Sequence, residues 1–129
     1  MPMKAAVSDL GALIIFTDDL EAVVKFYSAI GVPLELEQHG DGPVHYACEL
    51  GLTHFAVFHS GPGAAPEFRL GGSSFAGFTV NSLEAALGAA KSVKAEVVQE
   101  PTEYPWGWRA LVKDPDGRVV ELFQRPPRA

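Results

Sequence analysis

The sequence of 129 residues contains one cysteine, Cys48, and no long hydrophobic run. A single cysteine excludes a disulfide within the chain and a zinc site built from several thiolates. No apolar stretch approaches the roughly 20 residues that a membrane-spanning helix requires. The N-terminal stretch lacks a long apolar segment ending at a small-residue cleavage site, so no secretion signal is predicted. These absences favour a soluble protein of the reducing cytoplasm.

Basic residues are also scarce, since ten Lys and Arg stand against 16 Asp and Glu and give a net charge of −6. They are scattered, whereas a surface that binds nucleic acid requires clustered basic residues. Neither nucleic acid nor a membrane is an expected partner. A mildly acidic surface is compatible with a cationic ligand and equally with an ordinary enzyme. The length favours one compact domain over residues 1–129.

A short phrase occurs twice in the sequence. Phe16-Thr17 recurs 62 positions later as Phe78-Thr79, and Leu20-Glu21-Ala22 recurs 63 positions later as Leu83-Glu84-Ala85. A strand-length apolar run ends at each phrase, and apolar residues at the spacing of one helix face follow it. The repetition predicts two units of similar structure. The second unit has one extra residue in the turn between its strand and its helix.

The patterns predict the same order of elements in both halves. Asp18 or Asp19 is expected to cap the first helix and Ser82 the second. In the first half we expect a helix at 20–30 and strands at 11–17, 34–38, 44–50 and 53–60. In the second half we expect a helix at 83–90, an aromatic turn at 101–107 and strands at 74–80, 95–100, 108–113 and 118–124.

One such unit is too small to bury both faces of its sheet. We therefore predict an α+β fold in which two βαβββ modules form a curved mixed sheet around a cleft, with the helices on the outer face. Module one spans about residues 9–60, a linker rich in Gly, Ala and Pro spans 61–72, and module two spans about 73–125.

Two segments resemble a known family. DDLEAVVKFYSAIGV (18–32) is similar to the first helix of the vicinal oxygen chelate superfamily, and YPWGWRALVKDPDGRVVELFQ (104–124) is similar to its last hairpin. This superfamily includes glyoxalase I, bleomycin resistance proteins, fosfomycin resistance enzymes and extradiol dioxygenases. The resemblance covers about residues 9–125. It implies the paired βαβββ fold and a homodimer, but no single reaction, because one fold hosts many chemistries.

The resemblance also implies where a metal ion would bind. In metal-using relatives, His, Glu or Gln ligands come from the first and last strands of each module. Glu121 matches one of these positions, whereas the others fall on Phe75, on Ala56 and within 11–13. A catalytic metal site requires about three protein ligands. We therefore expect no cofactor; the alternative is one divalent metal ion bound by Glu121 with His54 or His45 recruited.

Aromatic and titratable residues give the candidate cleft. A 63-residue offset places His45 at the position equivalent to Trp108, and Pro43 at that of Trp106. Glu121 is a candidate general base, a partner for a cationic ligand or a structural remnant, and His45 is a candidate for proton transfer. The predicted ligand-binding residues are His45, Phe75, Tyr104, Trp106, Trp108 and Glu121.

These observations favour a glyoxalase/bleomycin resistance-like protein that binds a small organic molecule in an aromatic cleft without a metal ion. One alternative is a metal-dependent lyase, isomerase or dioxygenase of the same superfamily that uses Glu121 as ligand and base. Another is a metal-free enzyme that uses Glu121 and His45 as base and acid. Whether the chain is an enzyme therefore stays open at the level of sequence.

Overall fold

The computed structural model describes residues 4–59 and 75–127. The predicted linker at 61–72 lies outside these residues. The described elements follow the order βαβββ twice. They are β1 (Ala12–Thr17), α1 (Leu20–Ala29), β2 (Glu35–Glu37), β3 (His45–Leu50), β4 (Thr53–His59), β5 (Ala76–Thr79), α2 (Leu83–Ser92), β6 (Val97–Tyr104), β7 (Gly107–Lys113) and β8 (Val119–Gln124).

Both helices begin where their capping residues predict. The Asp19 side chain accepts a hydrogen bond from the Ala22 amide at 3.1 Å, so Asp19 rather than Asp18 caps α1. Ser82 accepts from the Ala85 amide at 3.1 Å and caps α2. After α1, Gly31 adopts φ 110°, the backbone region that favours glycine and ends helices.

The strands form two four-stranded mixed sheets with the same internal order. The first sheet runs β1-β4-β3-β2 and the second runs β5-β8-β7-β6. β1 is parallel to β4 and β5 is parallel to β8, while the other neighbours are antiparallel. The predicted α+β fold of two βαβββ modules is therefore confirmed.

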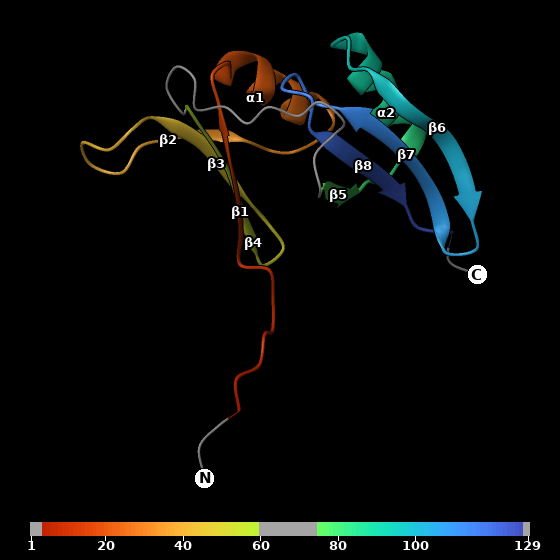
Figure 1. Ribbon diagram of the computed structural model, residues 1–129, viewed down its shortest axis with the longest axis horizontal. Helices are drawn as coiled ribbons and strands as arrows, with labels where there is room; N and C mark the ends of the chain where they lie inside the picture. The colour runs from red at the N-terminus through yellow and green to blue at the C-terminus, as the bar shows by residue number, and fades with distance from the viewer. Residues whose placement is uncertain (1–3, 60–74, 128–129) are drawn as a thin grey trace.

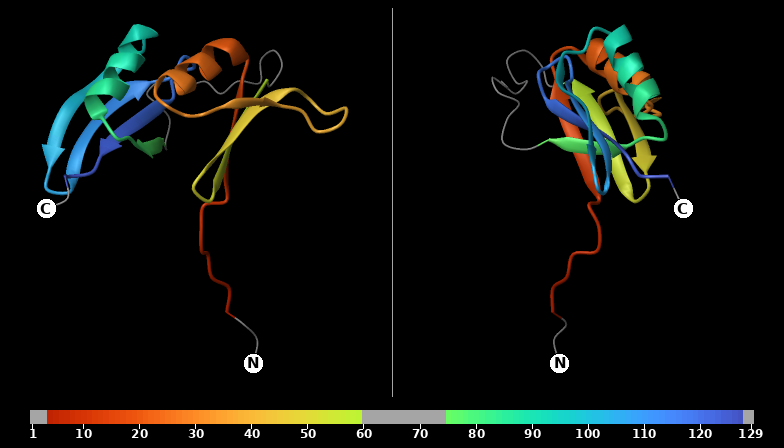
Figure 2. Two further views of the ribbon diagram at one scale, coloured as in Figure 1. Left: turned by 180° about the vertical axis from the view of Figure 1, so that it is seen from behind. Right: turned by 90° about the vertical axis from the view of Figure 1, so that its right-hand side faces the viewer.

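The two helices cover one side of the molecule. α1 and α2 lie side by side along the top of Figure 1, and the sheets diverge beneath them. The two views of Figure 2 show the same arrangement, with the segment before β1 extending away from the body. Among the described residues, no helix is long and apolar enough to cross a membrane. The faces of the two sheets away from the helices are called the open faces below.

The predicted aromatic turn at 101–107 is wrong, because β6 continues through most of it to Tyr104 and β7 starts at Gly107. β6 is an edge strand, so Pro101 removes no hydrogen bond that a second neighbouring strand requires. The β6–β7 register also shifts between Gln99 and Thr102, on either side of this proline. The connection is thus reduced to Pro105 and Trp106.

The strand register corrects the phase of the sequence repeat. Phe16 pairs with Phe58, whereas Thr79 pairs with Phe123. Since α1 and α2 begin 63 residues apart, at positions 20 and 83, Phe16 is equivalent to Thr79 and not to Phe78. One offset of 63 thus relates both β1 to β5 and α1 to α2. The shared letters Phe-Thr lie one residue out of phase.

The same register corrects the equivalence of His45 and Trp108. Tyr46 pairs with Val57, so His45 lies one step further along, opposite Phe58. In the second sheet the residue opposite Phe123 is Arg109. Phe58 and Phe123 hold equivalent places, so the equivalent of His45 is Arg109. The predicted equivalence of Pro43 and Trp106 is likewise wrong by one residue.

Tyr27 joins the two modules at the centre of the core. Its ring contacts Phe55 of module one and Phe78 of module two, with centroids 5.2 and 6.0 Å away. Its hydroxyl donates a hydrogen bond of 2.8 Å to Asp114, which also pairs with Arg118 at 3.0 Å. Burial, and then the Asp114 carboxylate, raise the pKa of Tyr27 well above its usual range. The hydroxyl therefore stays protonated and keeps donating at neutral pH.

Candidate functional site

Strand alternation separates the residues that face the helices from those on the open faces. Ile15, Phe55 and Val57 of the first sheet, and Val112 and Leu122 of the second, belong to the core beneath the helices. The alternating positions lie on the open faces. On the first sheet these include Phe16, Glu37, His45, His54, Ala56 and Phe58, and on the second they include Gly77, Thr79, Arg109 and Glu121.

A cavity of about 820 Å³ lies between β1 and β5, the facing edge strands of the two sheets. Aliphatic and aromatic side chains make up most of its wall. Within the described residues, its aromatic rings are Phe16, Tyr27, Phe55, Phe75 and Phe78.

The described wall of this cavity contains no His, Cys, Asp or Glu. Its one charged residue within the described ranges is Arg118, which pairs with Asp114 and Asp116 at 3.0 Å and donates to the Phe16 carbonyl. The wall is therefore suited to an uncharged apolar molecule and offers no side chain that transition metals prefer.

Phe16 and Phe75 are the accessible rings of this cavity, with 49% and 51% of their surface exposed. From Phe16 an aromatic row continues across the open face of the first sheet. The Phe16 and Phe58 centroids are 5.9 Å apart, and His45 stacks on Phe58 at 4.1 Å and 12°. We call Phe16, Phe58 and His45 the aromatic row.

The structure separates most of the predicted ligand-binding residues from this cavity. Of the six, Phe75 is the one found in the described wall. Tyr104 and Trp106 stack on each other at 5.2 Å and 14°, beside the β6–β7 connection. Trp108 lies on the helix-covered face, in a groove of about 480 Å³ beside Leu87 and Lys91 of α2. Trp108 and Glu121 therefore face opposite sides of the second sheet.

Glu121 lies in a polar network on the second open face. Its carboxylate is 3.6 Å from the Arg109 guanidinium, which also donates to Gln99 at 3.2 Å and to the Tyr104 hydroxyl at 3.3 Å. A Cβ at Gly77 would lie 2.9 Å from a Glu121 carboxylate oxygen, so the absence of a side chain there makes room for Glu121.

Arg109 was not among the site residues that the sequence predicted. The β7–β8 pairing identifies its role. Arg109 pairs with Phe123, which lies two residues from Glu121 along β8, so Arg109 and Glu121 are diagonal neighbours on one face of the sheet.

A metal ion of the family type does not fit these residues. Ala56 lies beside Ile14 and Ala47, none of which has a ligand atom in its side chain. Glu121 is engaged by Arg109, and His54 Nδ1 lies 2.6 Å from Glu49. Within the described ranges, Glu121 thus pairs with Arg109 and His54 with Glu49, so the two residues of the alternative metal site have different partners.

Cys48 is unsuited to be a nucleophile. It lies on the helix-covered side of β3, where burial, followed by Glu49 and Glu35, raises the pKa of its thiol. The reactive thiolate is therefore disfavoured near neutral pH.

Comparison with known proteins gives a family and a fold. The profile of the Glyoxalase/Bleomycin resistance protein/Dioxygenase superfamily matches residues 9–122. No curated protein matches the sequence.

Several solved structures share the fold. TnmS3, an antibiotic binding protein from Streptomyces sp. CB03234, is 23% identical with a TM-score of 0.67, over 95% of this chain and 100% of that chain. A glyoxalase/bleomycin resistance protein from Albidiferax ferrireducens T118 is 22% identical with a TM-score of 0.70, over 90% and 98%. TioX from Micromonospora sp. ML1 is 20% identical with a TM-score of 0.62, over 92% and 100%.

Proposed function

The chain belongs to the glyoxalase/bleomycin resistance protein/dioxygenase superfamily, and we propose that it binds a small, flat, largely apolar organic molecule between β1 and β5 without a metal ion. The observation that carries this proposal is the aromatic wall of the cavity, which in its described part has no metal-binding side chain. A volume of about 820 Å³ falls within the range of small-molecule sites. Aromatic walls favour flat ligands, which stack on them.

One structure with the same fold supports a small organic ligand. TnmS3, which shares the fold, is an antibiotic binding protein. Antibiotics that contain flat aromatic ring systems are accordingly the first compounds to test against this chain. The half-exposed rings of Phe16 and Phe75 are the proposed contacts that a ligand reaches first.

The metal-dependent alternative, a lyase, isomerase or dioxygenase with Glu121 as ligand and base, has less support. It requires a free carboxylate with further ligands beside it, whereas Glu121 lies next to Arg109. The metal-free enzyme that uses Glu121 and His45 also has less support. His45 is 3% exposed and lies on the other sheet from Glu121.

A homodimer is part of the proposal, as the family resemblance implies. One feature supports it: the segment before β1 extends from the body, and Val7 and Leu10 are 93% and 67% exposed (Figure 1). Exposed apolar side chains of this kind are often covered in an assembly. Light scattering coupled to size exclusion chromatography measures the mass of the assembly directly. A monomeric mass at all protein concentrations contradicts the proposed homodimer.

The probe for the cavity is N-phenyl-1-naphthylamine, an uncharged aromatic molecule whose fluorescence rises in apolar surroundings. We expect the chain, purified without an affinity tag and kept in EDTA, to bind it saturably. Phe16→Ala and Phe75→Ala should each weaken binding about tenfold, because each removes about 1–2 kcal/mol of aromatic contact.

Trp106→Ala is the matched control, because Trp106 is 63% exposed and lies outside the described cavity wall. Its affinity for the probe should equal that of the unmodified chain. Binding that EDTA abolishes, or that Trp106→Ala weakens while Phe16→Ala and Phe75→Ala do not, contradicts the proposal.

A further inference from the structure

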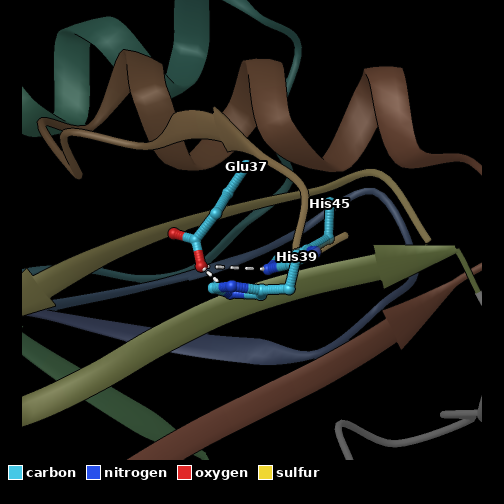
Figure 3. Close-up of side chains that lie close together, drawn as sticks. All are labelled: Glu37, His39 and His45. Carbon is cyan, nitrogen blue, oxygen red and sulfur yellow. Dashed lines mark ion pairs between the residues drawn. The ribbon is translucent and has the colours of Figure 1, made fainter. Parts of the chain in front are cut away.

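The β2–β3 hairpin brings one carboxylate and two imidazoles together at the outer edge of the first sheet. Glu37 ends β2, His45 begins β3, and His39 lies in the connection between them. Figure 3 shows both rings directed at the same carboxylate oxygen of Glu37. One ligand atom from each residue lies within 4.8 Å of the others, and no second group of three His, Cys, Asp or Glu in the described ranges does so.

The local sequence explains why the three side chains converge. Glu37 and His39 are two residues apart, and Glu37 pairs directly with His45 across the strands. The connection is closed by a hydrogen bond from the Gly42 amide to the His39 carbonyl and by one from the Gln38 side chain to the Gly42 carbonyl, both 2.9 Å. The hairpin therefore fixes the three positions before any ion binds.

His45 is held in the tautomer that a metal ion requires. Its Nδ1 lies 3.0 Å from the Pro43 carbonyl oxygen, and because a carbonyl only accepts, Nδ1 carries the proton. In the neutral ring the lone pair is then on Nε2, which lies 3.5 Å from the Glu37 carboxylate. A backbone carbonyl behind the ring is the usual second partner of a metal-binding histidine. The stack on Phe58 fixes the ring plane.

The other two ligands are open to solvent. The His39 side chain is 77% exposed and that of Glu37 is 34% exposed, whereas that of His45 is 4% exposed. An ion can therefore arrive from solvent at a site whose inner ligand is already oriented. Ligand atoms of a tetrahedral zinc ion lie roughly 3.4 Å from one another, so a small movement of the exposed His39 completes the geometry.

We propose that Glu37, His39 and His45 bind one transition-metal ion of the Zn²⁺ type, with solvent at the remaining position. Two imidazoles and one carboxylate favour Zn²⁺ over Mg²⁺ or Ca²⁺, which prefer oxygen ligands. The site lies on β2 and β3, away from the family-type positions on β1, β4, β5 and β8. Bound metal joins the two strands and holds His45 against Phe58, so it also steadies the aromatic row that leads to Phe16.

The test uses the full chain without an affinity tag, stripped with EDTA and dialysed, and titrated with Zn²⁺ by calorimetry. We expect one ion per chain with micromolar or tighter affinity, and a Co²⁺ complex with the visible absorption of a four-coordinate ion. His39→Ala and Glu37→Gln should each weaken Zn²⁺ binding at least tenfold. Both residues are accessible, so these variants should retain the circular dichroism of the unmodified chain even if the buried His45→Ala variant fails to fold.

His54→Ala is the matched control, because it removes the Glu49–His54 pair on the same open face without touching the hairpin. It should leave the Zn²⁺ affinity unchanged. The proposal is overturned if millimolar Zn²⁺ does not bind, if His39→Ala binds as well as the unmodified chain, or if His54→Ala weakens binding equally. The probe titration in EDTA reports on the cavity alone, so the two proposals fail or stand separately.

Discussion

At the scale of single residues, Gly107 and Gly88 show how one residue type has opposite effects in different places. Gly107 begins β7 with φ 146°, and a Cβ there would collide with the Gln124 backbone carbonyl oxygen and lie 2.6 Å from the Phe123 ring. Gly88 lies in the middle of α2, exposed, with nothing within 4 Å of an added Cβ. The first position requires glycine, whereas the second gains nothing from it.

Gly107→Ala should therefore lower the free energy of unfolding by about 2–4 kcal/mol, from backbone strain together with the displaced Phe123 ring. Gly88→Ala should raise it by about 0.5–1 kcal/mol, because alanine is the better helix former. Urea unfolding followed by circular dichroism measures both. Equal effects of the two substitutions would show that the β6–β7 connection is not built as described.

At the scale of elements, the helices could be predicted closely and the strands less so, for a physical reason. Helix caps and apolar spacing are local signals, and Asp19 and Ser82 act where the pattern placed them. Strand positions depend on partners that are distant in sequence. Pro101 indicates a turn by itself, yet an edge strand accommodates it.

The side of the sheet on which a residue lies is harder to predict than the first and last residues of its strand. A shift of one residue reverses every side chain. The shared letters Phe-Thr thus suggested one equivalence, whereas the register makes Phe16 the counterpart of Thr79. Extending the offset of 63 to the later strands likewise placed His45 with Trp108 instead of Arg109, and so combined residues of opposite faces in one candidate cleft.

The cap of α1 gives a prediction at this scale. Asp19→Ala should lower the free energy of unfolding by about 1 kcal/mol, because the Ala22 amide loses the carboxylate that accepts its hydrogen bond. Asp19→Asn keeps an acceptor and should cost a small fraction of that. Thermal unfolding of the two variants side by side distinguishes the cap from a general effect of charge, which predicts similar losses in both.

At the scale of the whole molecule, the sequence indicated two modules but not how they are joined. Tyr27 is one of the buried residues of α1, while its partner Asp114 is 87 residues away. Nothing local connects these two positions. Prediction of the site had the same limit, because the cavity lies between edge strands of different modules and its wall is formed by residues of both.

Tyr27→Phe should lower the free energy of unfolding by about 1.5–3 kcal/mol, the usual worth of a hydrogen bond to a charged group. The pKa of Tyr27 is raised in the folded chain, so its contribution is complete below the ordinary tyrosine pKa of 10.0. Above that pH the unfolded chain loses the proton while the folded chain keeps it. The stability due to this hydroxyl therefore falls as pH rises, by up to about 1.4 kcal/mol per pH unit.

Urea unfolding of both proteins at about pH 8 and about pH 11 measures this effect. The difference between the unmodified chain and Tyr27→Phe should shrink at the higher pH. A difference that stays constant over this range contradicts a protonated, buried Tyr27 as the link between the modules.

The central claim is that an apolar cavity between β1 and β5 binds a flat molecule without a metal ion. Its most direct test is the affinity of the Phe16→Ala/Phe75→Ala double variant for N-phenyl-1-naphthylamine in EDTA. Independent losses add, so binding should weaken about a hundredfold while the fold is retained. Unchanged affinity in the double variant would show that the molecule binds elsewhere and would contradict the account.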